Sequence, residues 1–115
     1  MTADQVLNKT LSITLNASGA GEGSMGPSSM FERWRIDRMV TEGSSVLEPS
    51  LNVYRNSKGS VPIDFTPFGN QDISETTTTL ELPTGEFIIA SYTGGSSGAV
   101  MRFKIEGLIT YPGTE

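Results

Sequence analysis

The C-terminal third of the chain constrains the fold most, because two strand-like runs flank a short glycine-rich segment there. Residues 87–93 and 99–111 are rich in β-branched and aromatic side chains, and Gly94-Gly-Ser-Ser-Gly98 separates them. Runs of this kind, bounded by glycine and serine, are typical of β-strands. The pattern predicts a β-hairpin within residues 85–107. Nowhere do apolar residues recur at helical spacing over about ten residues, so we expect an all-β chain.

Alternating apolar and polar residues predict further strands. Between residues 6 and 16, Leu11, Ile13 and Leu15 share one face of a half-buried strand. About seven to eight short strands at this spacing predict an antiparallel β-sandwich of the immunoglobulin-like or jelly-roll-like type. The length of 115 residues suits a single domain over residues 1–115, with residues 1–5 as a candidate free N-terminal arm. The remaining strands are expected over residues 31–41, 51–56, 61–65 (at a sheet edge, because of Pro62) and 76–82.

The strand over residues 31–41 has a conflict in its alternation. Trp34, Ile36 and Val40 fall on one face, which predicts a core position for Trp34, but Arg38 falls on the same face. Either the Arg38 side chain extends along the sheet to its edge, or a β-bulge near Met39 resets the register.

Glycine, proline and small polar residues predict the connections. Residues 17–30 and 66–75 are expected to be long loops, and loops of that length are usually functional or mobile. Asn56-Ser-Lys-Gly59 is typical of a hairpin turn in which Gly59 adopts a positive φ. Gly107 is expected to bend the last strand.

Methionine and aromatic side chains in or beside these loops are the candidate partner contacts. Such side chains on loops more often form contact surfaces than remain idle, although a loop folding back onto the core would use them equally well. Tyr92 stands beside the glycine-rich segment, and its hydroxyl is expected to reach water or a partner. The candidate residues are Met25, Met30, Phe31, Phe65, Phe68 and Tyr92.

The chain has no histidine and no cysteine, which removes most catalytic chemistry. Ser-His-Asp and Cys-His arrangements, disulfides and thiolate metal sites are excluded. A glycosidase would need two carboxylates across a sugar-sized cleft, for which a thin sandwich has little room. Asp72 and Glu75 could ligate calcium, but a turn-capping role fits Asp72 better. We therefore expect no enzyme, cofactor or metal; the carboxylates considered are Asp64, Asp72, Glu75, Glu81 and Glu86.

The charge balance disfavours nucleic acid and anionic membranes as partners. Eight basic and 13 acidic residues give a formal net charge of −5 at pH 7, whereas phosphate binding depends on clustered lysine and arginine. The basic cluster Arg33, Arg35 and Arg38 is interleaved with acids, so a solvated strand face with cross-strand ion pairs is a better interpretation than an anion site. Apolar stretches are too short to span a membrane, and residues 1–5 do not resemble a signal peptide, which favours synthesis in a cytoplasm without classical export.

Several segments in order resemble a known family. They are Arg33-Trp-Arg-Ile36, Val53-Tyr-Arg55, Gly85-Glu-Phe-Ile88, Tyr92-Thr-Gly-Gly-Ser-Ser-Gly-Ala99 and Ile105-Glu-Gly107. Together, over roughly residues 31–110, they resemble small β-sandwich proteins encoded among the virion structural genes of tailed actinobacterial phages. The matching motifs are structural and not catalytic.

The resemblance implies a non-enzymatic structural component of a tailed phage virion. A capsid decoration or minor capsid protein is the leading expectation, and an accessory of the neck or tail is the alternative. Its partners would be the major capsid protein or neck and tail proteins, its assembly a homotrimer, and its location the virion, assembled in the host cytoplasm. A carbohydrate-binding module is a further alternative, for which Trp34, Tyr54, Tyr92 and Phe103 could form a sugar-stacking platform.

Overall fold

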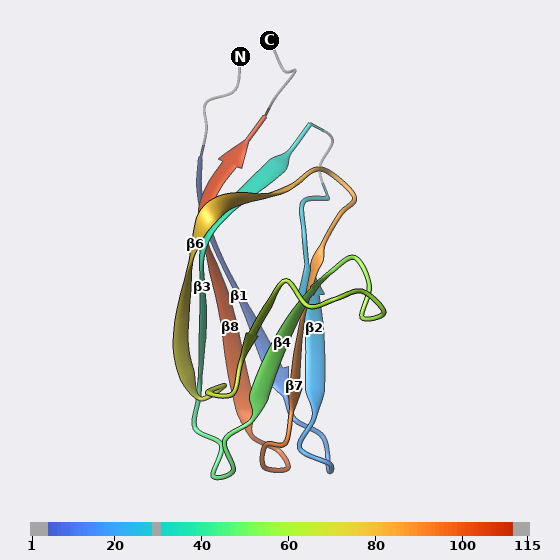
Figure 1. Cartoon of the computed structure of the whole chain (residues 1–115), viewed down its shortest axis with the longest axis vertical. Coiled ribbons are helices and arrows are strands. Elements are labelled where there is room, and N and C mark those ends of the chain that lie inside the picture. Colours follow the sequence, from blue (N-terminus) through green and yellow to red (C-terminus); the bar gives the residue numbers. More distant parts are fainter. Residues whose placement is uncertain (1–4, 29–30, 112–115) are drawn as a thin grey trace.

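Two four-stranded antiparallel sheets pack face to face in the computed structural model, which describes residues 5–28 and 31–111 and, within them, no side chains of residues 74–79 (Figure 1). The first sheet has the order β1 (Gln5–Thr14), β8 (Val100–Thr110), β3 (Arg33–Gly43) and β6 (Gln71–Leu82). The second has the order β2 (Gly21–Met25), β7 (Ile88–Thr93), β4 (Ser50–Arg55) and β5 (Asp64–Thr66). The predicted all-β sandwich is confirmed. Within the described residues, no helix is long and apolar enough to cross a membrane.

The core lies between the inner faces of the two sheets. Burying a leucine, isoleucine or phenylalanine side chain completely contributes about 1.5–3 kcal/mol each, so this layer is the main source of stability. Trp34 belongs to it, as predicted, and its indole N–H donates a 2.7 Å hydrogen bond to Oε1 of Glu32. The largest fully buried side chains include Leu7, Leu15, Ile36, Leu82, Ile88, Tyr92, Met101, Phe103 and Ile105.

A β-bulge in β3 resolves the conflict in the alternation of that strand. The register shifts between Ile36 and Arg38, so that Met39 faces the core and Arg38 does not. The bulge interpretation is therefore confirmed, whereas the expectation that Val40 shares the face of Trp34 is wrong. Gly107 on β8 pairs with Ile36 beside this bulge, where a Cβ atom would lie 1.8 Å from the carbonyl oxygen of Arg35.

The predicted C-terminal hairpin is wrong. β7 pairs with β2 and β4, whereas β8 pairs with β1 and β3 in the other sheet, so residues 94–98 cross from one sheet to the other. Gly94 and Gly98 have φ angles of 80° and 79°, as a tight connection of either kind requires. The local sequence signal is the same for a hairpin and for a link between sheets, and only long-range pairing separates them.

The expected loop over residues 17–30 contains a strand, β2. Its glycines allow the strand to run close beneath β1, since a Cβ atom on Gly21 would lie 2.9 Å from Cγ2 of Ile13. Glycine in a strand marks such close approaches. The prediction of a loop over the whole of residues 17–30, which was based on their glycine content, is therefore wrong. The second expected loop is also shorter, because β6 already begins at Gln71. In the turn after β4, Asn56 and not Gly59 has the positive φ, 64°.

The strand expected over residues 61–65 is reduced to the three residues of β5. Val61 and Ile63 precede it and are exposed, so they do not form an inward face. Its predicted edge position is confirmed, because β5 pairs with β4 and ends the order of the second sheet.

Candidate docking surface

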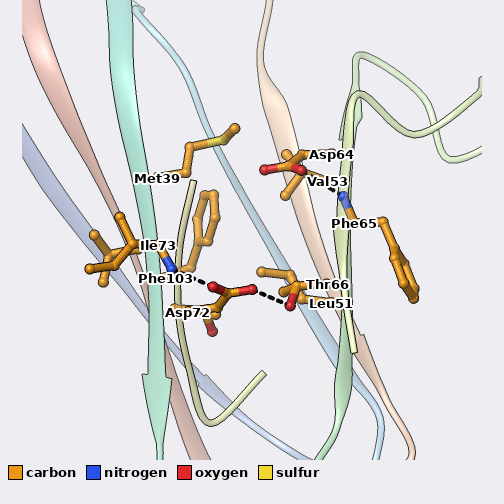
Figure 2. A pocket seen from close by; sticks show the side chains of 11 residues that line it. Met39, Leu51, Val53, Asp64, Phe65, Thr66, Asp72, Ile73 and Phe103 are labelled. Atoms are coloured by element: carbon orange, nitrogen blue, oxygen red, sulfur yellow. Dashed lines mark hydrogen bonds between the residues drawn. The ribbon is translucent and has the colours of Figure 1, made fainter. Parts of the chain in front are cut away.

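The edge strands β5 and β6 belong to different sheets and border one pocket of about 210 Å³. In the described chain, β5 pairs with β4 and β6 pairs with β3, so the outer backbone edge of each strand has no strand beside it. Figure 2 shows the space between them. We call this region the open side and define it by Asp64, Phe65, Thr66, Phe68, Asp72 and Ile73.

Strand register determines which side chains enter the pocket. Asp64 and Thr66 pair with the core residues Val53 and Leu51, and residues directly opposite each other point to the same face. Asp72 likewise pairs with the buried Thr41. Asp64, Thr66 and Asp72 therefore point into the space between the sheets, as Figure 2 shows. Apolar side chains of Met39, Leu51, Val53 and Phe103 line the rest of the pocket.

Hydrogen bonds hold the two carboxylates in place. Asp72 accepts hydrogen bonds from the hydroxyl of Thr66 and, at 2.8 Å, from its neighbour's backbone N–H at Ile73. Both hydrogen bonds lower the pKa of Asp72 below its ordinary value, and the bond from Thr66 has the larger effect. Asp64 accepts a 2.9 Å hydrogen bond from the backbone N–H of Phe65. No ion pair of either aspartate is found among the described residues.

Apolar side chains surround this polar mouth on the outside. Phe65 and Ile73 alternate with the aspartates and point away from the pocket in Figure 2. They are 56% and 50% exposed, and Phe68 in the β5–β6 connection is 57% exposed. Three large apolar side chains between residues 65 and 73 are thus exposed to solvent beside the pocket.

The candidate contact residues do not form one surface. Phe65 and Phe68 lie on the open side, whereas Phe31, which is 53% exposed, lies near the end of the sandwich where β3 begins. Met25 on β2 is half-buried against the core, and Met30 lies outside the described residues. Tyr92 is a correction: it is fully buried, and its hydroxyl lies 2.7 Å from that of Thr41 instead of reaching water or a partner.

Of the five carboxylates considered for catalysis, Asp64 and Asp72 line the same pocket. Glu81 pairs with Arg33 at 3.2 Å and Glu86 with Arg55 at 2.9 Å, away from it. The side chain of Glu75 lies outside the described ones. Within the described residues, no three acidic side chains gather in a way that could hold a metal ion.

The arginine cluster forms ion pairs on a half-exposed strand face. Arg33 pairs with Glu81 across to β6, and Arg38 pairs with Glu106 across to β8 at 3.1 Å. Arg35 pairs within its own strand with Asp37 at 3.2 Å. The interpretation as a solvated face is confirmed, and each exposed pair adds at most about 1 kcal/mol.

The aromatic platform considered for sugar stacking does not form. Trp34, Tyr92 and Phe103 are buried in the core, and Tyr54 is only partly exposed. The three buried rings belong to the core because their positions along the strands point toward the space between the sheets.

Sequence reasoning named Asp64 and Asp72 but did not place them together, and it missed Ile73. The alternation of Asp64, Phe65 and Thr66 places the two polar residues on one face of the strand, and in the structure that face points inward. No family model, curated protein or solved structure matches this chain.

Proposed function

We propose that the chain is a non-enzymatic structural component of a tailed phage virion, most simply a capsid decoration or minor capsid protein. It binds other virion proteins through the open side. The observation that carries the docking role is the exposure of Phe65, Phe68 and Ile73 beside two strand edges that pair with no other strand of the described chain. The resemblance over roughly residues 31–110 supports the virion assignment.

The exposed side chains and strand edges of the open side suit a docking role. Apolar side chains supply contact area, and unpaired strand edges supply backbone donors and acceptors for an added strand. On a repeating lattice, many modest contacts of this kind add up through multivalency. Trimer formation would provide several such contacts at once.

Two features of the pocket support a non-catalytic role. Its volume of about 210 Å³ lies below the ~300–1,000 Å³ of typical small-molecule sites. A carboxyl group that acts as general acid at neutral pH needs a raised pKa, whereas hydrogen bonds lower that of Asp72.

The test is binding of the purified chain to assembled capsids made from the major capsid protein alone. We expect saturable binding at a fixed copy number per lattice site, measured by light scattering and co-sedimentation. Phe68→Ala should weaken binding. Phe31→Ala is the matched control, since it removes an equally exposed phenylalanine distant from the open side.

Three outcomes would redirect the proposal. Binding to tails or neck complexes and not to capsids would assign the chain to that part of the virion. Binding to host polysaccharide without any binding to particles would favour the carbohydrate-binding module. Equal loss in Phe31→Ala and Phe68→Ala would remove the open side as the specific docking surface.

A further inference from the structure

The pocket of the open side joins an apolar floor to a doubly acidic mouth. Met39, Val53 and Phe103 contribute to the floor, whereas Asp64 and Asp72 enter from opposite sheets (Figure 2). Thr66 and the backbone engage these carboxylates, but no described cation pairs with them. The charge at the mouth is therefore available to an incoming group.

Size and position limit what could enter. A pocket of about 210 Å³ is too small for a typical organic ligand but suits a single side chain. The pocket opens between two strand edges that lack neighbours in the described chain. An extended segment pairing with either edge would direct every second side chain toward the space between the sheets.

We propose that the open side binds an extended segment of a partner protein and takes one lysine or arginine side chain of that segment into the pocket. The aliphatic stem packs on Met39, Val53 and Phe103, and the cationic head lies between Asp64 and Asp72. This inference rests on the proposed docking function and adds the chemistry of the partner.

Charge complementarity selects this occupant over the others. An acidic side chain would meet two carboxylates of its own sign. A wholly apolar side chain would cover Asp64 and Asp72 without giving either a positive charge to pair with, and burying a charge that has no countercharge is costly. Lysine and arginine alone combine a long methylene stem with a positive head that carries several N–H donors.

The experiment titrates the isotope-labelled 115-residue chain with side-chain analogues, followed by amide NMR shifts. The probes are n-propylguanidinium and n-butylammonium, and n-butanol is the neutral match of the second. Saturable shifts are expected at Val53, Asp64, Thr66 and Asp72 with both cations, and much smaller ones with n-butanol. Asp64→Asn should weaken cation binding by about tenfold, as expected for the loss of a charged hydrogen-bond partner.

Glu48→Gln is the control variant, because it removes the same charge at an exposed site outside the pocket and should leave binding unchanged. Equal shifts with n-butanol, shifts spread over the acidic surface, or unchanged binding in Asp64→Asn would each overturn the proposal. If no cation binds and an Asp64→Val, Asp72→Val double variant self-associates, the inward carboxylates only protect the sheet edges from pairing.

Capsid binding by the double variant Asp64→Asn, Asp72→Asn separates this inference from the proposed function. If that variant binds capsids as well as the unaltered chain does, the basic side chain is not used and only the docking function stands. If cations bind the pocket but capsids do not bind the chain, the pocket chemistry stands and the virion assignment fails.

Discussion

The hydroxyl groups of Thr41 and Tyr92 lie 2.7 Å apart inside the sandwich and connect β3 of one sheet to β7 of the other. Thr41 also donates a 2.7 Å hydrogen bond to the carbonyl oxygen of Gly69, so the tyrosine hydroxyl is the donor in the pair. This contact lies behind the open side, because Thr41 also lines its pocket. It links the packing of the core to the position of the β5–β6 connection.

Replacing Tyr92 with phenylalanine should destabilise the fold modestly. The ring stays in the core, but the hydrogen bond to Thr41 is lost, at a cost of about 0.5–1.5 kcal/mol. Tyr92→Ala should cost about 3–5 kcal/mol because it also empties a core position. Urea unfolding of both variants measures the two values. Equal losses would show that the hydroxyl, and not the ring, dominates.

Stability should fall in alkaline solution because of Tyr92. Burial raises the pKa of Tyr92 from 10.0 to about 12. Above pH 10 the unfolded chain loses this proton first, so the unfolded state is favoured progressively until pH passes about 12. The free energy of unfolding should therefore drop between pH 10 and 12 in the unaltered chain. Tyr92→Phe should lack this part of the decrease in the same pH series.

Asp72 should contribute to acid sensitivity. Hydrogen bonds from Thr66 and Ile73 lower its pKa below the ordinary 3.8, so the folded chain binds this proton less readily than the unfolded chain does. The stabilisation is present above that value and is lost as pH falls through the lowered pKa. The difference in unfolding free energy between neutral and strongly acidic solution should be smaller in Asp72→Asn. Glu48→Gln serves as the control, and an equal reduction there would contradict the assignment.

Gly107→Ala should be strongly destabilising. A Cβ atom at this position would lie 1.8 Å from the backbone carbonyl oxygen of Arg35, and backbone cannot move aside as a flexible side chain can. We expect a loss of more than about 2 kcal/mol or failure to fold. Gly59→Ala is the control, since its Cβ would meet only the Ser57 hydroxyl at 3.4 Å. Thermal unfolding of the two variants makes the comparison, and similar midpoints would contradict the bulge geometry.

The alternation of apolar and polar residues along each strand predicted much of the core. Ile13, Leu15, Ile36 and Leu82 are buried, as the period of two predicts, and Trp34 is buried because it shares the phase of Ile36. The alternation also indicated a bulge near Met39 as one of two ways to keep Arg38 off the buried face of Trp34, and the structure shows the bulge. These features depend on neighbours along the chain.

The candidate site was less accessible to sequence reasoning. Phe65 is a candidate contact residue in the sequence, and it is exposed on the short edge strand β5, but the sequence does not show which residues lie across the pocket from it. Asp64 and Asp72 come together because β5 and β6 lie at the same side of two different sheets. No local pattern carries that information.

By itself, the sequence determined that the chain is all-β, where most strands run and many of the apolar residues that form the core, because the period of two is a property of each strand alone. Only the tertiary structure decided that β7 and β8 separate into different sheets and that Gly21 belongs to a strand. It also decided that two aspartates face one pocket. The physical reason is that strand partners are selected by contacts between segments distant in the sequence. Local preferences fit more than one pairing equally well, and only the packing of those segments decides between the pairings.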